Sequence, residues 1–264
     1  MATSRASGLR PAAAAEKACC AASRRIAASA RSSAVAAGSA ERTPNSTRAA
    51  PKFPGVAAKF RLGAPIYSEP AACPSCSSGA LDVYGRHASF CAGGGDLTAR
   101  HNGVRDLVGR LAKEAQLSVE TEKPHMLLDG SRQKPADVFF TSWTDGTPLA
   151  VDVTGVDVLA PLPSGYTSVM DFVEARADAK RVKYKAQCDA VGVAFRPFVF
   201  GSVGGFGVDA VVVIKELGRR IARAKGSKAS EEIAVVRKKL SMTIQRHQAG
   251  AFIKRGSELG VLVY

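Results

Sequence analysis

Three cysteines and one histidine follow one another at a spacing typical of a metal site. The pattern is Cys73-x2-Cys76-x10-His87-x3-Cys91. Thiolates and imidazoles are the ligands that zinc prefers, and two close pairs of them can complete a tetrahedron around one ion. We therefore predict a structural Zn²⁺ site in a small knuckle. The alternative is a chance cluster of thiols in a reduced protein.

Two aspartates lie within short apolar segments that are typical of strands. Asp137 lies in the strand predicted over Pro135–Thr141, and Asp152 lies in the strand predicted over Leu149–Thr154. Because strand side chains alternate between faces, each aspartate is expected to point away from its apolar neighbours. A lone buried carboxylate is costly, whereas two side by side can share a divalent cation. The alternative is that both are ordinary aspartates at strand edges or turns.

A cluster of cations follows the second of these segments. Lys180, Arg181, Lys183 and Lys185 fall on a helix predicted over Asp171–Ala190. Lys180 and Lys183 are three residues apart and therefore lie on neighbouring positions of the helix surface. One of them could lean over the carboxylate pair and stabilise charge on a phosphate during metal-assisted hydrolysis. The alternative is a solvated basic face.

The elements that position these residues are predicted to form a mixed α/β fold. Apolar residues at helical spacing predict a helix over 101–115, and alternation predicts strands over 117–122, 135–141 and 149–154. A long helix, a strand over 193–200 and two further helices follow, the last beginning near Ser230. This order favours one central sheet with helices on its faces.

The charge of the chain is strongly positive and unevenly distributed. The 264 residues carry 37 Lys and Arg against 23 Asp and Glu, a net +14, and residues 1–62 hold +9 of it. This surplus favours a nucleic-acid partner and a nuclear location. Residues 1–62 are rich in Ala, Ser and Arg, which predicts a disordered basic tail, with an organellar transit peptide as the alternative. No apolar run approaches the roughly 20 residues of a membrane helix, so no membrane segment is expected.

Five features carry a resemblance to a known family, and they occur in the family's order. They are the Cys/Cys/His/Cys knuckle, Arg100-His101-Asn102, Lys134-Pro135-Ala136-Asp137, Asp152 at a spacing of 14 intervening residues, and Lys180-x2-Lys183-Tyr184. With these features, residues 73 to about 253 resemble the restriction-like endonuclease domain of site-specific non-LTR retrotransposons. That domain belongs to the PD-(D/E)xK nuclease superfamily. The resemblance implies a knuckle over 63–98 and a restriction-endonuclease-like domain over 99–264.

The resemblance also implies roles for individual residues. Asp137 and Asp152 would bind Mg²⁺ or Mn²⁺, and Glu120 or Glu122 could complete the site. His101 would lie near the site or bind the substrate backbone. The superfamily's third strand usually carries an acid-x-Lys motif, but this chain has Thr154 where that lysine would stand. The lysine is therefore expected on the following helix, with Lys183 as the first choice and Lys180 as the second.

Three functions follow from these observations. The first is a metal-dependent endonuclease that nicks DNA, or an RNA–DNA hybrid, and that derives from a retrotransposon. The second is a nucleic-acid-binding module that keeps the fold and the zinc but does not cut. The third is an organellar or structural protein whose basic tail is only a targeting signal.

Overall fold

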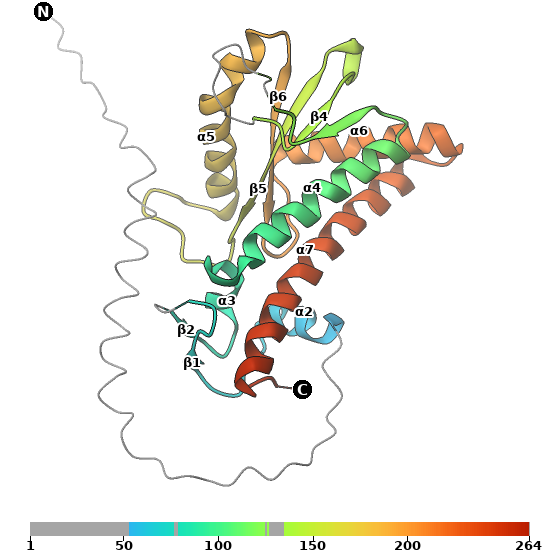
Figure 1. The fold of residues 1–264 in the computed structure, drawn as a ribbon. Helices are drawn as coiled ribbons and strands as arrows, with labels where there is room; N and C mark the ends of the chain where they lie inside the picture. The colour runs from blue at the N-terminus through green and yellow to red at the C-terminus, as the bar shows by residue number, and fades with distance from the viewer. Residues whose placement is uncertain (1–52, 77–78, 125, 127–134, 264) are drawn as a thin grey trace, which may run out of the picture.

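The computed structural model describes residues 53–76, 79–124, 126 and 135–263 (Figure 1). Its centre is a four-stranded mixed sheet in the order β3-β4-β5-β6. The strands are β3 (Val119–Thr121), β4 (Val138–Phe140), β5 (Leu149–Val156) and β6 (Ala194–Gly201). The first three are antiparallel neighbours, whereas β5 and β6 are parallel and are connected by a helix, α5 (Val169–Asp189). The predicted mixed α/β class is confirmed.

Helices cover both faces of this sheet. On one face lie α4 (Asp96–Glu114), α6 (Val208–Lys225) and the long α7 (Ala229–Leu259), and α5 covers the other (Figure 1). The main core contains Val151 and Val153 of β5, as alternation predicts, together with Phe140 of β4. Ala150 of the same strand packs on the α5 side. The face of β5 that carries Asp152 is therefore the face that α5 covers.

Helix α7 connects the sheet domain to the cysteine segment, residues 63–95, which carries Cys73, Cys76, His87 and Cys91. Its 31 residues span about 46 Å at 1.5 Å per residue. Its buried positions recur every four residues and include Val236, Leu240, Ile244, Gln248 and Phe252. Because four residues rotate by about 400°, the buried side shifts around the helix axis by about 40° from each of these positions to the next. One helix consequently packs on α6 and α4 and then on α2 (Phe53–Arg61) and α3 (Arg86–Phe90).

The cysteine segment is small and shares its core with residues near the end of the chain. It contains the hairpin of β1 (Ala71–Ala72) and β2 (Ala80–Leu81), then α3 and a single 3₁₀ turn, η2 (Gly93–Gly95). The other 3₁₀ turn, η3 (Thr144–Gly146), lies outside this segment and links β4 to β5 of the sheet. Leu81, Cys73 and Cys91 belong to the same apolar cluster as Phe252 and Leu262. The predicted segment 63–98 therefore packs against residues that are almost 200 positions away.

One expectation about the chain needs correction. Residues 53–61 were predicted to belong to the disordered tail, but they form α2, whose Phe60 ring lies 4.8 Å from that of Phe252. Val56 and Phe60 of this short helix are buried in the apolar cluster that contains Phe252 of α7. The prediction for residues 1–52 lies outside the described residues. Helix α7 begins at Ala229, close to the predicted start near Ser230.

Candidate active site and metal centre

The acidic residues of neighbouring strands open onto one cavity. Asp137, immediately before β4, and Asp152 of β5 both line a hollow of about 430 Å³. Helix α4 contributes Arg100 and His101, and α5 contributes Lys180. The remaining lining residues come from the first turn of α4 and from β5 and β6, and are Leu97, Thr98, Val153, Thr154, Gly155 and Phe200. The structure thus brings together four residues that the sequence analysis selected.

Asp137 is held by two different elements. Its Oδ2 accepts a hydrogen bond of 2.6 Å from the backbone amide of Val153, and its Oδ1 lies 3.3 Å from Nε2 of His101. The first contact fixes the carboxylate beside β5, next to Asp152. The second connects it to α4. Asp137 is therefore oriented toward the cavity from the end of a strand rather than from within one.

Asp152 is the more deeply buried carboxylate, at 5% exposure. Lys180 Nζ donates to its Oδ1 at 3.0 Å and lies 3.0 Å from its Oδ2, and the Thr154 hydroxyl donates to Oδ2 at 2.9 Å. Burial raises the pKa of Asp152 above its ordinary 3.8, opposed by Lys180, while the charge of Asp137 raises it further. A second cation at this position would relieve the repulsion between the two carboxylates.

The structure places Lys180, and not Lys183, at the carboxylate pair. Lys183 is exposed, and its Nζ lies over the ring of Tyr184 at 4.6 Å from the centroid. Positions three apart on a helix differ by about 60° around its axis. Lys180 lies on the side of α5 that faces β5, whereas Lys183 is rotated away from the cavity. Lys183, the first choice of the sequence analysis, thus lies outside the cavity, and Lys180, the second choice, lines it.

Neither of the glutamates considered for the site reaches the cavity. Glu120 of β3 is exposed and its Oε1 lies 2.8 Å from Nζ of Lys123. Glu122 forms an ion pair with Arg105 of α4, and neither residue lines the cavity. Among the described residues the cavity is lined by two carboxylates. Two such carboxylates fit one hard divalent cation such as Mg²⁺, which usually keeps several water ligands.

Arg100 is a functional candidate to which the sequence analysis assigned no role. It is 6% exposed, lines the cavity beside His101, and donates to the backbone oxygen of Ser89 at 3.2 Å and to Oε1 of Gln248. Its side chain therefore connects α4 to the cysteine segment and to α7. The sequence feature that could have indicated its burial is its partner Gln248, a polar residue within the apolar four-residue repeat of the last helix.

The contact of His101 with Asp137 predicts a pH dependence of stability. The hydrogen bond to Asp137 raises the pKa of His101 above 6.5, although burial opposes it. The folded state then holds this proton more tightly than the unfolded chain, so the stabilisation is complete below pH 6.5 and is lost as pH rises through the folded-state pKa. We expect the free energy of unfolding to fall by up to about 1 kcal/mol between about pH 6 and about pH 9.

This expectation is tested by urea unfolding of the zinc-loaded protein without added magnesium. His101→Gln removes the titrating group and keeps a hydrogen-bonding side chain of similar size. Its free energy of unfolding should decline less over the same pH range. Equal declines in the two proteins would show that the pair does not contribute.

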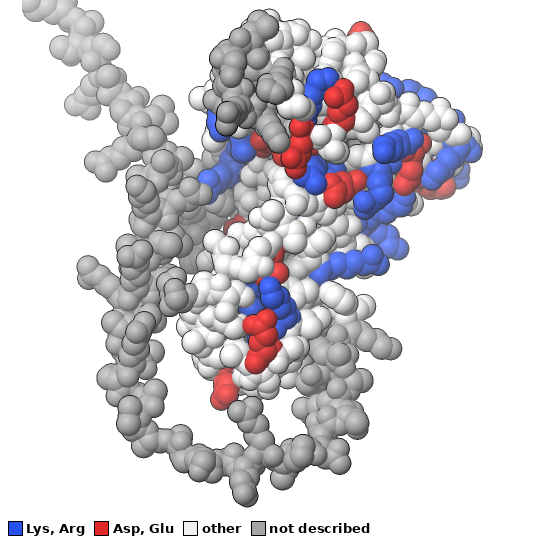
Figure 2. Space-filling view, viewed as in Figure 1, with Lys and Arg blue, Asp and Glu red and all other residues white. Residues whose placement is uncertain are grey.

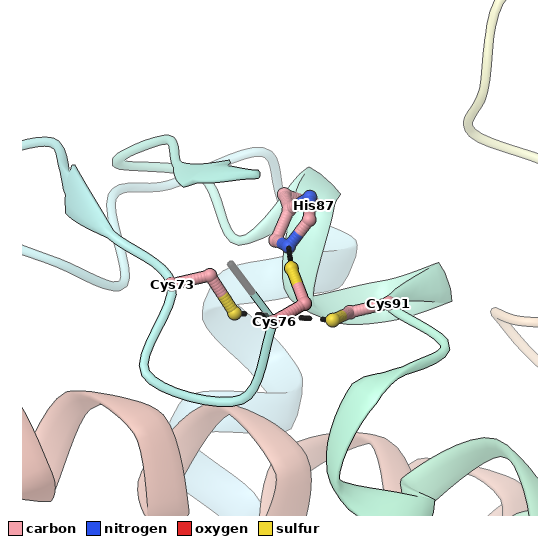
Figure 3. Close-up of side chains that lie close together, drawn as sticks. All are labelled: Cys73, Cys76, His87 and Cys91. Atoms are coloured by element: carbon pink, nitrogen blue, oxygen red, sulfur yellow. Dashed lines mark hydrogen bonds between the residues drawn. The ribbon is translucent and has the colours of Figure 1, made fainter. Parts of the chain in front are cut away.

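The four predicted zinc ligands converge on one point (Figure 3). Their ligand atoms all lie within 4.8 Å of one another. The Sγ atoms of Cys73 and Cys91 are 3.8 Å apart, and Sγ of Cys76 is 3.3 Å from Nε2 of His87. Two sulfurs at about 2.3 Å from a tetrahedral zinc ion are separated by about 3.8 Å. The cluster could therefore hold a metal ion such as zinc.

The backbone around the cluster is built to let the ligands approach. A Cβ added to Gly79 would lie 1.9 Å from the His87 ring, and one added to Gly93 would lie 1.9 Å from the carbonyl oxygen of Ser75. The Asp82 carboxylate accepts 3.0 Å hydrogen bonds from the amides of Tyr84 and His87, which fixes the start of α3. Glycine at both positions is thus needed for the observed packing.

The protonation states of the candidate ligands bear on metal binding. Burial raises the pKa of the Cys91 thiol to about 11, so that a cation must displace its proton on binding. Burial and the charge of Arg255 lower the pKa of His87, which keeps its imidazole in the neutral form that binds metals. Among the described residues the cysteines are free of disulfides.

No family model matches the chain, and no curated protein is significantly similar to it.

Basic side chains gather at one end of the molecule. Figure 2 shows Lys and Arg side chains where α6 and α7 meet, interspersed with acidic side chains, some of which pair with them, such as Glu232 with Lys225. The exposed basic residues there are Arg223, Lys225, Lys228, Arg237 and Lys238.

None of the described helices combines the length and the apolar composition that crossing a bilayer requires.

Proposed function

We propose that this protein is a metal-dependent endonuclease that hydrolyses phosphodiester bonds in DNA. The observation that carries the proposal is the convergence of Asp137, Asp152 and Lys180 on one cavity, with Lys180 Nζ 3.0 Å from the Asp152 carboxylate. Two acids can hold a divalent cation that activates water, and a lysine beside them can stabilise negative charge on a phosphate. The sequence resemblance to retrotransposon endonuclease domains supports the same assignment, with Lys180 in place of the lysine missing at Thr154.

Each residue has a definite task in this reaction. Asp137 and Asp152 would hold the divalent cation, which supplies charge neutralisation at the phosphate and favours ionisation of the attacking water. Lys180 holds its ammonium group at the edge of the same cavity, where it can orient a water and stabilise negative charge on the phosphate. Arg100 presents a second positive charge from α4, in a position to bind a phosphate oxygen.

The net charge of +14 and the basic end of α6 and α7 favour a polyanionic substrate. A DNA duplex or an RNA–DNA hybrid fits this charge, and a nuclear location follows from such a substrate. A nucleic-acid-binding module that does not cut is the second candidate. The observation that favours it is the presence of only two carboxylates in the described part of the cavity.

A nicking assay on supercoiled plasmid separates these functions. We expect the full-length protein to convert the plasmid to open circles when Mg²⁺ or Mn²⁺ is added, and to leave it intact without a divalent cation. Salt-sensitive binding without nicking at any metal concentration would support the second candidate instead. Absence of both binding and cleavage would exclude both functions.

A further inference from the structure

Helix α7 carries a fully buried arginine next to the cysteine cluster. Arg255 is 0% exposed, and its side chain reaches three neighbouring elements. Nη1 lies 2.7 Å from Oδ2 of Asp96, in the first turn of α4, and donates to the carbonyl of Ala251 at 3.1 Å. Nη2 donates to the carbonyl of Gly93 at 3.0 Å. Two of the three guanidinium nitrogens are thus fixed by oxygen acceptors.

The third nitrogen has no oxygen acceptor. Nε of Arg255 is buried and lacks a hydrogen-bond partner of ordinary geometry, although a buried guanidinium normally satisfies all its donors. Burial alone would lower the pKa of Arg255, but its contacts with the sulfurs of Cys73 and Cys91 and the charge of Asp96 together raise it above the ordinary value. The buried positive charge therefore faces the sulfur atoms of the cluster.

The chemistry of the ligand set explains why a cation is needed there. Three thiolates, one neutral imidazole and one divalent cation sum to a single negative charge. Cys73 and Cys91 are 6% and 4% exposed, so water cannot solvate that charge effectively. A guanidinium beside the sulfurs would offset it and orient the ligands, as outer-sphere partners do at other metal sites.

We infer that Arg255 is the outer-sphere partner of the metal–thiolate centre, and that through Asp96 it couples metal occupancy to the first turns of α4. This inference rests on the predicted metal centre and adds a positioning residue to it. The first turns of α4 carry Arg100 and His101 into the cavity of the proposed nuclease site. Loss of the zinc should therefore loosen one wall of that cavity, although none of the four candidate zinc ligands lines it.

The test compares Arg255→Met with Arg255→Lys and, as a matched control, Arg237→Met at an exposed arginine of the same helix. Zinc content and the rate of zinc transfer to a chromophoric chelator are measured on each full-length protein. We expect wild type and Arg237→Met to bind one zinc and release it slowly. Arg255→Met should bind zinc about 10–100-fold more weakly, and Arg255→Lys should be intermediate.

The outcomes distinguish the inference from the metal centre itself. If the wild-type protein contains no zinc, or if the Cys73→Ser protein retains zinc, the proposed metal centre is excluded. Zinc bound by wild type with equal affinity and release rate in Arg255→Met would overturn the role of Arg255.

A second measurement needs no variant that might fail to fold. Hydrogen exchange of the wild-type protein is compared with and without bound zinc. We expect protection to be lost over residues 73–91 and also over 96–101. Loss confined to residues 73–91 would overturn the coupling to α4.

Discussion

Replacement of Asp152 by asparagine is expected to reduce plasmid nicking by about a thousandfold, which corresponds to about 4 kcal/mol of transition-state stabilisation. Asparagine keeps the volume of the side chain but removes the charge that would hold the cation and that pairs with Lys180. The effect should be larger than that of any substitution outside the cavity. It is measured as the initial rate of open-circle formation at saturating Mg²⁺.

The same substitution should not destabilise the protein. Burial raises the pKa of Asp152, so the ionised carboxylate is less favourable in the folded state than in the unfolded chain. A neutral isostere relieves that cost, and the melting temperature should be equal to or above that of wild type. An increase in stability with a loss of activity is the pattern expected of a residue retained for function.

The matched control is Asp178→Asn, at an exposed aspartate of α5 whose carboxylate pairs with Arg181. It removes the same charge from a helix next to the cavity and should nick at the wild-type rate. Nicking by Asp152→Asn at the wild-type rate would eliminate the proposed cation site. An equal loss in both variants would point to general electrostatics and not to the cavity.

Alternation along β5 was sufficient to predict the direction of Asp152. Val151 and Val153 are buried in the main core, and Asp152 emerges on the other face. Apolar residues at helical spacing similarly predicted a helix over 101–115, where the structure has most of α4. Such local patterns succeed because the chain repeats the geometry of a single element, and a hydrophobic core then fixes which side is buried.

Alternation could not predict the surroundings of Asp137. The regular strand begins at Val138, so Asp137 is not constrained by the pleat, and its carboxylate reaches the amide of Val153 and the imidazole of His101. These partners lie 16 and 36 positions away along the chain. Their approach depends on how α4 lies against the sheet, and a sequence pattern carries no information on that geometry.

Long-range packing also determines the surroundings of two arginines to which the sequence analysis assigned no role. Arg100 and Arg255 resemble many surface cations in the sequence, and only the contact of α7 with α4 and the cysteine cluster buries them. Gln248 and Arg255 do fall on the buried side of α7. Polar residues within an apolar repeat are therefore the signal that could have identified them, because burial of such groups requires a partner.

Lys180 and Lys183, two of the lysines of α5, provide the sharpest test of the proposed catalytic set. Lys180→Met should slow nicking by about 100-fold, since it removes an ammonium group that lies 3.0 Å from the Asp152 carboxylate. Lys183→Met should stay within about twofold of wild type, because its Nζ lies over Tyr184 outside the cavity. Both variants lose one positive charge from the same helix, so their affinities for DNA, measured at equal salt, should fall by similar small factors. A selective loss in Lys183→Met would instead restore the choice favoured by the sequence and would require α5 to rotate about its axis when DNA binds.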